Sequence, residues 1–470
     1  MPTTLPDWLT HLESLHPKTI SLGLDRVAEV KQRMNLSPDF PVIVVGGTNG
    51  KGAVCAMLEA MLTAAGYRVG CYTSPHLLRY NERVRVNQRE VEDAALCASF
   101  AAIEQARTLT PALSQGERGH NARDVGINPD LRGDIALTYF EFGTLAAMQL
   151  FIEQRVEVAI LEVGLGGRLD AVNVFDNDCA IITSVDIDHT DYLGDTREAI
   201  GFEKAGIFRS GKVAICAERD VPDSMLQHAQ SIGATLWRIE QDFGFKPISM
   251  TATQPWQNKM AIASDVPPAN SPSQQWDFYS PTGARASLPY PALRGQFQLG
   301  NASAVLAALE VLKEKLPVNM AAVRRGLVEV SLTGRFQTLP GKPTVILDVA
   351  HNPHAARSLA QNWASLPTAS CRYAVFAMLK DKDIAGVIAA LQDQVDVWLI
   401  ASIHAPRGAT ADEVSAALQV CHVRGEIQKF DNPTAAFVHA CNVAGENDRI
   451  TAFGSFYTVA EVLQAHRLHR

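Results

Sequence analysis

The sequence predicts an α/β fold with two domains, each built on a mainly parallel sheet that helices cover. Its length of 470 residues exceeds what one hydrophobic core usually holds, so two domains are expected. Several apolar runs rich in β-branched residues end in glycine or polar residues, as residues 156–163 do before Gly164-Leu-Gly-Gly167. Such runs are typical of strands buried on both faces, with ligand-binding loops at their carboxyl ends.

The first domain is predicted to cover residues 1–332. Residues 108–132 have little apolar periodicity and lie between two complete helical patterns, so we interpret them as a surface insertion. Residues 254–291 are polar and proline-rich and are expected to form an irregular edge of this domain. The predicted strands are residues 41–45, 67–72, 156–163 and 179–185, and the predicted helices are residues 53–65, 91–107 and 137–151.

The second domain is predicted to cover residues 333–470, because a second α/β rhythm begins near Gly334. It is expected to be smaller and doubly wound. Its predicted strands are residues 344–349, 373–378, 395–401 and 449–453, and a helix is expected to close the chain.

Composition and charge exclude some classes of function. Lys and Arg number 42 against 50 Asp and Glu, so the net charge of −8 argues against a general nucleic-acid or anionic-membrane binder. The eight cysteines include no CxxC pair, which favours free thiols in a reducing compartment. The first 39 residues show no signal-peptide pattern, and no apolar run is long enough to span a bilayer. We therefore expect a cytoplasmic protein, acting as a monomer, with no nucleic-acid or membrane partner.

The segment Gly46-Gly-Thr-Asn-Gly-Lys-Gly52 carries the first functional signal. Glycines between a strand and a helix let backbone N–H groups converge on a phosphate, and Lys51 is expected to neutralise it. The general P-loop pattern GxxxxGK[ST] is not matched, because Val45 stands at its first glycine position and Gly52 follows the lysine. A plain glycine turn is the alternative interpretation.

Seven further motifs accompany this loop in a fixed order. They are Tyr72-Thr-Ser-Pro-His-Leu77, Glu162-Val-Gly-Leu-Gly-Gly-Arg-Leu-Asp-Ala171, Asp188-His189, Glu203-Lys-Ala-Gly-Ile207, Gly334-Arg-Phe-Gln337, Asp348-Val-Ala-His-Asn-Pro353 and Gly454-Ser455. Together with Gly47-Thr-Asn-Gly-Lys-Gly52, the set resembles the folylpolyglutamate synthase family of the Mur-ligase superfamily. The resemblance covers nearly the whole chain except residues 108–132 and 254–291.

The resemblance implies an ATP-dependent carbon–nitrogen ligase. Its first domain is then the Mur-ligase central type, a P-loop ATPase that binds ATP and pterin, and its second is a Rossmann-like glutamate-ligase domain. The implied reaction joins L-glutamate to dihydropteroate, forming dihydrofolate, and to reduced folates. A carboxylate is a poor acyl donor, so ATP first converts it to an acyl phosphate, which the amine of glutamate attacks. Two anions must meet in this reaction, which is why cations are needed.

The resemblance also implies the site residues and the cofactors, which are ATP, Mg²⁺ at two sites and a monovalent cation. The metal ligands implied are Ser74, Glu162, His189 and a carbamylated Lys204. The ATP-binding residues implied are Thr48, Asn49, Gly50, Lys51, Gly52, Asn301, Arg335 and Asp348. The substrate-binding residues implied are Thr19, Ile20, Ser21, Leu22, Thr138, Tyr139, Phe140, Glu141, Leu169, Asp170, Ala171, His351 and Ser455. The catalytic residues implied are Lys51, His189, Lys204, Arg335 and His351.

Some of these residues have a structural alternative. For Lys204 the structural alternative is a surface ion pair, and for His189 and Phe140 it is ordinary packing in the core. For Arg335 it is a domain-interface ion pair, and for Asn301 and Ser455 it is a helix cap. Glu162 is harder to explain structurally, because a carboxylate that ends an apolar strand is costly to bury without a partner.

Two residues depart from the family pattern. Ala53 stands where the family usually has Ser or Thr, which removes a hydroxyl near the metal and phosphates. Ser21 stands where bifunctional members often have Asp, which bears on the dihydropteroate activity.

Three other functions remain open at this stage: a folylpolyglutamate synthase without the dihydropteroate activity, a Mur-type cell-wall ligase, and a nucleotide-dependent switch. Only about 40 residues precede the loop, too few for the extra N-terminal domain of the cell-wall enzymes.

Overall fold

The computed structural model describes residues 2–16, 20–108, 134–248, 275–295 and 297–468. Thr19, nearly all of the predicted insertion and residues 254–274 therefore lie outside the described residues. By internal packing the chain divides into two compact units, Met1–Arg238 with Ala307–Ala322, and Ile239–Leu306 with Val323–Arg470. The predicted domain boundary at residues 332–333 stays a prediction.

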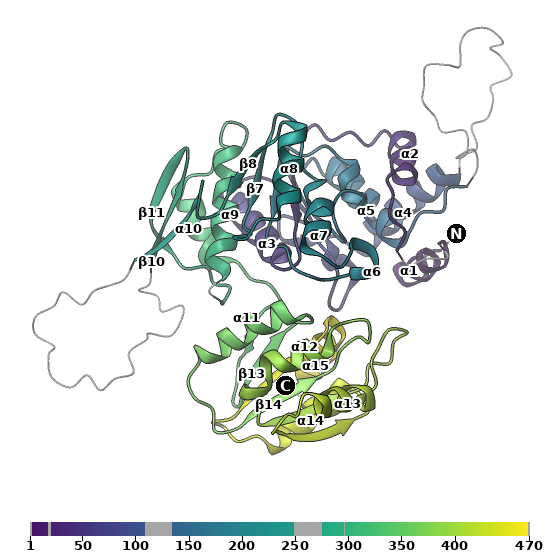
Figure 1. The fold of residues 1–470 in the computed structure, drawn as a ribbon. Coiled ribbons are helices and arrows are strands. Elements are labelled where there is room, and N and C mark those ends of the chain that lie inside the picture. The colour runs from purple at the N-terminus through teal and green to yellow at the C-terminus, as the bar shows by residue number, and fades with distance from the viewer. Residues whose placement is uncertain (1, 17–19, 109–133, 249–274, 296, 469–470) are drawn as a thin grey trace, which may run out of the picture. The chain divides into compact units, whose positions relative to one another are not determined.

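An eight-stranded sheet forms the centre of the first unit (Figure 1). Six of its strands are parallel, as predicted, whereas β3 and β4 pair antiparallel and add an edge that was not predicted. In spatial order the strands are β4 (Arg89–Glu90), β3 (Val84–Val86), β2 (Val69–Tyr72), β5 (Val158–Glu162), β1 (Val42–Gly46), β6 (Cys179–Ile182), β7 (Val213–Cys216) and β8 (Thr235–Arg238).

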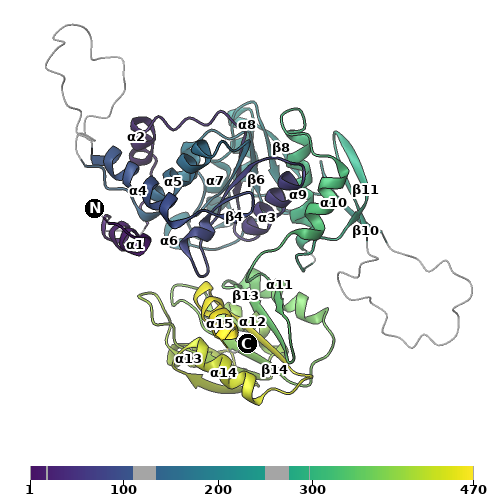
Figure 2. The same ribbon diagram turned by 180° about the vertical axis from the view of Figure 1, so that it is seen from behind.

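Helices cover this sheet on both faces. Helices α7 and α8 lie toward the viewer in Figure 1, and α3 lies toward the viewer in Figure 2, which shows the opposite side. The helices of this unit are α1 (Leu5–Ser14), α2 (Asp25–Arg33), α3 (Lys51–Ala64), α4 (Asp93–Thr108), α5 (Tyr139–Glu153), α6 (Thr190–Leu193), α7 (Arg197–Ala205) and α8 (Asp223–Ile232), with 3₁₀ turns η1 (Tyr80–Arg83) and η3 (Ala171–Val174).

The strand register brings the functional loops to one edge of this sheet. Val45 of β1 pairs with Glu162 of β5, and Gly46 of β1 pairs with Ile182 of β6. The residues that follow all three strands therefore leave the sheet at the same carboxyl edge, which is where ligands bind in open α/β sheets.

The second unit contains two sheets. A three-stranded antiparallel sheet consists of β9 (Gly244–Ile248), β10 (Gln275–Ser280) and β11 (Gly283–Pro289). Part of the segment predicted as an irregular edge is thus a regular hairpin, β10–β11. Helices α9 (Phe297–Val311) and α10 (Met320–Glu329) each contain residues of both units.

The other sheet has six strands, in the order β12 (Gln337–Leu339), β13 (Thr344–Asp348), β17 (Arg449–Phe453), β14 (Arg372–Phe376), β15 (Val397–Ala401) and β16 (Glu426–Phe430). All pairs but β12–β13 are parallel. Its helices are α11 (Pro353–Ala364), α12 (Ile384–Leu391), α13 (Ala411–Val420), α14 (Pro433–Val443) and α15 (Phe456–Leu468). The predicted doubly wound second domain is confirmed in this part of the chain.

All eight cysteines are free, as predicted. Within the described residues no helix combines the length and the apolar character that a membrane span requires.

Gly70 of β2 tests how tightly helix α5 packs on the sheet. A Cβ added there lies 2.7 Å from two ring atoms of Phe151, a fully buried residue of α5. Gly70→Ala should therefore lower the free energy of unfolding by about 1–3 kcal/mol, measured by urea denaturation. Gly445→Ala is the control, because its Cβ meets only Asp448 Oδ2, at 3.5 Å. Equal stability of Gly70→Ala and wild type would contradict the packing.

Candidate active site

The nucleotide loop connects β1 to α3 and is shaped by two glycines. Gly47 has φ +139°, and a Cβ there would lie 2.0 Å from the Thr183 hydroxyl, so no other residue fits without displacing the loop. Gly50 has φ +91° and stands directly before the first residue of α3. Both positions require glycine for backbone reasons, and the helix that follows directs its free N–H groups and its positive dipole end at the loop.

Residues after β6 hold this loop in place. Thr48 Oγ1 donates to the Asp186 carbonyl at 3.1 Å and accepts from the Asp186 N–H at 3.0 Å. The Asn49 N–H donates to Ser184 Oγ at 3.0 Å, and the Asn49 carbonyl accepts from Thr183 Oγ1 at 2.6 Å. The side chain of Thr48 is thus engaged in fixing the loop, whose conformation is set by the protein itself.

Lys51 is the first residue of α3 and folds back over the loop. Its Nζ donates to the carbonyls of Gly47 at 3.0 Å and Thr48 at 3.3 Å. The ammonium group, the loop and the helix N-terminus therefore place positive charge at one point. This arrangement can bind an anion such as a phosphate group.

Ser74 and Glu162 meet next to this loop along the same sheet edge. The Ser74 N–H donates to Glu162 Oε2 at 2.9 Å, and the Glu162 residue is only 5% exposed. The contact joins the segment after β2 to the last residue of β5. It provides one carboxylate, and Ser74 supplies a hydroxyl beside it.

Lys204 is fully buried on α7 and lies among other charges. Burial, with the positive charge of Lys51, lowers the pKa of Lys204 to about 7, although Asp188 and Asp170 oppose the shift. Burial also raises the pKa of Asp170 to about 7. The surface ion pair considered for Lys204 is therefore wrong: it is the neighbouring Glu203 that forms one, with Arg168 at 2.8 Å.

His189 has φ +53° and precedes the short helix α6. Its Nε2 lies 3.9 Å from Asp188 Oδ2, and its side chain is 33% exposed, so it is not a core histidine. Among the described residues no three His, Cys, Asp or Glu side chains form a complete metal cage. Mg²⁺ typically uses one or two carboxylates plus substrate phosphates, so a single buried Glu162 beside a phosphate-binding loop fits that cation.

Three segments predicted to bind the pterin lie together. Arg26 joins the first two, because it donates to the Ser21 carbonyl and to Glu141 Oε1, each at 2.9 Å. The third is joined through Gly23, whose N–H donates to the Leu169 carbonyl at 3.4 Å. Ile20 and Leu22 flank Ser21, and Ala171 begins η3 after Asp170.

Within these segments the side chains have different roles. Thr138 and Glu141 form a reciprocal cap at the start of α5, with N–H to side-chain distances of 2.7 and 3.2 Å. Both are buried and committed to this helix. Phe140 is only partly buried and lies over Gly164, with Tyr72 at 5.7 Å between ring centroids. Phe140 and its neighbour Tyr139 both pack against the core from its border and remain partly exposed, which is compatible with stacking.

In the second unit, Asp348 anchors the segment after Gly334. Its Oδ2 accepts from the Phe336 N–H and its Oδ1 from the Ala350 N–H, both at 2.8 Å. Burial raises the pKa of Asp348, and Arg335 opposes the shift. Arg335 stacks over the Phe456 ring at 5.4 Å, so its guanidinium is held beside the carboxyl edge of this sheet.

His351 and Ser455 lie at that same edge, because β13 and β17 end in register at Asp348 and Phe453. His351 Nδ1 lies 2.8 Å from the Val349 carbonyl. Ser455 Oγ accepts from the Thr458 N–H at 3.0 Å and so caps α15.

Asn301 is not a helix cap. Helix α9 already begins at Phe297, and Asn301 lies in its second turn, where it donates to Gln298 at 3.0 Å and is 6% exposed. The cap interpretation is therefore wrong.

Two family models match the chain: the Mur ligase middle domain over residues 133–309, and the Mur ligase glutamate ligase domain over residues 334–456. The dihydrofolate synthase/folylpolyglutamate synthase of Escherichia coli strain K12 is 42% identical, and the match covers 98% of this chain and 95% of that protein. The chain belongs to the dihydrofolate synthase/folylpolyglutamate synthase family of Mur ligases. It is thus an enzyme of the ligase class, and its α/β fold is that of the family.

Solved structures agree with this assignment. E. coli FolC in complex with DHPP and ADP is similar with a TM-score of 0.85 and 42% identity, covering 100% of both chains. A bifunctional folylpolyglutamate synthase/dihydrofolate synthase with Mn, AMPPNP and L-glutamate bound is similar with a TM-score of 0.81 and 42% identity, covering 100% of this chain and 98% of that chain.

Arg85 is a residue of this ligase chain that the sequence analysis missed. It lies on β3 and donates to Glu59 of α3 at 2.8 Å, to Thr73 Oγ1 at 3.1 Å and to the Glu82 carbonyl at 2.8 Å. Glu59 is 3% exposed, so the ion pair is largely buried. Arg85 thereby connects the helix that begins at Lys51 with the residue before Ser74. The alternation Arg83-Val-Arg85, which runs from η1 into the short strand β3, was the only sequence signal.

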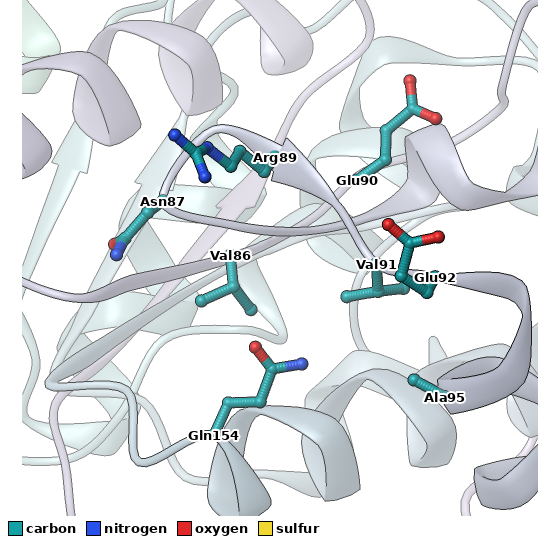
Figure 3. A pocket seen from close by; sticks show the side chains of 8 residues that line it. All are labelled: Val86, Asn87, Arg89, Glu90, Val91, Glu92, Ala95 and Gln154. Atoms are coloured by element: carbon teal, nitrogen blue, oxygen red, sulfur yellow. The ribbon is translucent and has the colours of Figure 1, made fainter.

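A cavity of about 580 Å³ lies away from the predicted site, between the β3–β4 hairpin and helices α4 and α5 (Figure 3). It contains none of the predicted site residues. Basic Arg89 and acidic Glu90 and Glu92 stand around it, so it has no single charge character. The lining residues are Val86, Asn87, Arg89, Glu90, Val91, Glu92, Ala95 and Gln154.

Arg85→Lys tests whether the contacts of Arg85 with Glu59, Thr73 and Glu82 orient Ser74. Lysine keeps the charge but cannot reach Glu59, Thr73 and Glu82 together. We expect kcat/KM to fall roughly 10- to 100-fold, with a raised Mg²⁺ requirement, in a magnesium titration of ATP-dependent turnover. Arg79→Lys is the control, since Arg79 is 61% exposed in its ion pairs on the same segment. An unchanged Mg²⁺ dependence in Arg85→Lys would mean that Arg85 only stabilises the fold.

Proposed function

We propose that this chain catalyses ATP-dependent addition of L-glutamate to dihydropteroate, and of further glutamates to folates, through an acyl phosphate. The observation that carries the proposal is the shared sheet edge in the first unit. There, β1, which leads into the glycine loop of Lys51, pairs in register with β5, which ends at Glu162 in contact with Ser74. A phosphate-binding loop beside a buried carboxylate is what transfer of the ATP γ-phosphate to a carboxylate requires.

Each residue near that edge then has a distinct task. The loop of Thr48, Asn49, Gly50 and Gly52 binds the ATP phosphates through its backbone, and Lys51 neutralises their charge. Ser74 and Glu162 hold one Mg²⁺, while His189 and a carbamylated Lys204 hold a second. The metal lowers the repulsion between ATP and the carboxylate of the acceptor substrate. A monovalent cation is a further proposed cofactor.

Ala53 affects how this metal is held. It lies in the first turn of α3, is 5% exposed and offers no hydroxyl. The protein therefore relies on Ser74 and Glu162 for the first cation.

The acceptor substrate is proposed to place its pterin against Phe140. The same site is proposed to include the segments of Ile20, Ser21 and Leu22, of Thr138, Tyr139 and Glu141, and of Leu169, Asp170 and Ala171, with Thr19 preceding the first of them. Ser21 is bonded through its carbonyl to Arg26, so its backbone position is held although the Asp side chain of other members is missing.

Roles are also proposed for residues of the second unit. Asn301, Arg335 and Asp348 are assigned to the nucleotide, and His351 and Ser455 to L-glutamate. Phe456 holds Arg335 over its ring at 5.4 Å and lies 6.3 Å from the His351 ring, which places these two basic side chains near one another.

We further propose that residues 1–332 and 333–470 act as the two domains of a monomeric, cytoplasmic enzyme. On this proposal it uses no nucleic-acid or membrane partner.

A parallel product assay tests the function. ATP and L-glutamate are supplied with dihydropteroate in one series and with tetrahydrofolate in the other, and products are separated by mass. We expect dihydrofolate in the first series and glutamylated tetrahydrofolate in the second. Product in the second series alone would reduce the function to folylpolyglutamate synthesis, and nucleotide binding without product in either would reject the ligase.

Lys51→Ala should abolish ligation while leaving the fold intact. The hydrogen bonds that Lys51 Nζ makes within the described residues go to carbonyls of its own loop, so its loss removes phosphate neutralisation and little packing. We expect turnover to fall by at least about 100-fold, with a thermal unfolding curve close to that of wild type. Lys313→Ala, at an exposed lysine, is the matched control. Activity retained in Lys51→Ala would overturn the loop assignment.

Carbamylation of Lys204 can be observed directly. The neutral amine attacks CO₂, an N–C bond forms, one proton is released, and the lysine becomes an anion. Because burial lowers the pKa of Lys204 to about 7, the reactive amine dominates above pH 7 and is lost below it. We expect a carbamate signal in ¹³C NMR with labelled bicarbonate that fades as the pH falls through about 7.

The same signal should be absent from Lys204→Ala. Lys204→Glu, which supplies a carboxylate, should retain more activity than Lys204→Ala. An unmodified amine in fully active enzyme at ample bicarbonate would refute the modification.

A further inference from the structure

A small cavity lies at the amino edge of the six-stranded sheet, the edge opposite His351 and Ser455. Strand register pairs Arg372 of β14 directly with Arg449 of β17, so their side chains share one face of the sheet. Thr451 follows on the same face, and Trp363 approaches from the end of α11. The lining residues are Trp363, Arg372, Tyr373, Gln394, Val395, Arg449 and Thr451.

Of the two arginines, only Arg372 is neutralised by the protein. Its Nε and Nη2 donate to the two oxygens of Asp396 at 2.8 and 2.7 Å. Arg449 donates to the Pro367 carbonyl, and no carboxylate in the described part of the chain pairs with it. The carboxylate of its neighbour Asp448 is occupied by the N–H groups of Cys371 and Gly445, at 2.9 and 2.7 Å.

Arg449 therefore carries a charge that the cavity leaves uncompensated. The residue is 8% exposed, and burial together with the charge of Arg372 lowers the pKa of Arg449. Two like charges directly opposite each other on parallel strands repel, and a buried unpaired charge is costly. The cost of the unpaired charge falls if an anion lies beside the Arg449 guanidinium.

Trp363 supplies the second, independent observation. Its indole Nε1 is buried, and within the described residues it has no hydrogen-bond acceptor. A buried N–H of this kind requires a partner. Thr451, 2% exposed, adds a hydroxyl to the same wall. The described residues that line the cavity thus offer donors and positive charge and include no carboxylate, and the nearby carboxylates of Asp396 and Asp448 are engaged by Arg372 and by backbone N–H groups.

We propose that this cavity is a binding site for one monovalent anion of halide size, chloride in the cell, held by Arg449, Trp363 Nε1 and Thr451. Size decides the class of ligand. The cavity is small, with room for about one water-sized guest, so a monatomic anion fits it better than phosphate, sulfate or a carboxylate. Water could accept from Trp363 but leaves the Arg449 charge uncompensated. The site lies at the end of the strands away from the proposed chemistry, so it stabilises the second unit rather than takes part in ligation.

Thermal unfolding of the full chain tests the site. The protein is compared in sodium chloride, sodium bromide and sodium gluconate at equal ionic strength. We expect the Tm to be about 2–4 °C higher in chloride or bromide than in gluconate. Trp363→Phe, which removes the N–H, should lose this halide increment.

Trp398→Phe is the matched control. Trp398 also has a buried indole N–H with no acceptor among the described residues, but it does not line the cavity. Its variant should keep the full halide increment even if its Tm is lower. If Trp363→Phe fails to fold, Thr451→Val takes its place. It has nearly the same volume but no hydroxyl, and it should reduce the halide increment in Tm.

Anomalous diffraction from crystals grown with bromide locates the ion. A peak within hydrogen-bond distance of Trp363 Nε1 and the Arg449 guanidinium, together with the halide increment, is the expected result. Three results would overturn the proposal: no halide increment in wild type, an equal increment in Trp363→Phe and wild type, or a bromide peak without any increment, which would mean an adventitious ion only.

Discussion

The packing of the nucleotide loop against the segment after β6 is the constraint on which the candidate active site depends. Gly47 lies so close to Thr183 that a single added carbon would collide with its hydroxyl. Asn49 bonds to both Thr183 and Ser184. Because β1, β5 and β6 end in register, a displaced loop would also change its position relative to Glu162. The loop backbone therefore determines where a phosphate can lie, and Lys51 adds charge to a position already built.

Buried charge gives this edge its chemical character. Lys204 and Asp170 are both fully buried, and burial moves the pKa of each toward 7 from opposite directions. Each group therefore changes its charge readily when another charge approaches, and ATP and a divalent cation bring charges of both signs. An unreactive protein core would have no reason to contain such a pair, since burying either group costs free energy. Glu141 is buried as well, but it pairs with Arg26 and caps the start of α5.

Sequence reasoning succeeded where the signal was local. The apolar runs predicted β1, β2, β5 and β6 to within a few residues, because strands buried on both faces are continuously apolar. The glycine loop was recognisable because Gly47 and Gly50 each meet a local backbone requirement. Sequence reasoning failed where the role of a residue depends on a partner that is distant in the sequence. The antiparallel strands β3 and β4 have only three and two residues, and the role of Arg85 arises from its contacts with Glu59 and Thr73.

The sequence by itself determined the fold class, the family and the kinds of residue at the site, because these follow from spacing along the chain and from motif order. Only the tertiary structure decided that Glu141 caps α5, that Lys204 is buried rather than at the surface, and that Arg449 pairs with no carboxylate among the described residues. Burial and pairing depend on residues far away in sequence, and no local pattern encodes the strand register that brings them together. The loop at Lys51 shows both cases. Its glycines could be recognised in the sequence, whereas Thr183 and Ser184, which hold it, follow the neighbouring strand β6 and were identified only from the structure.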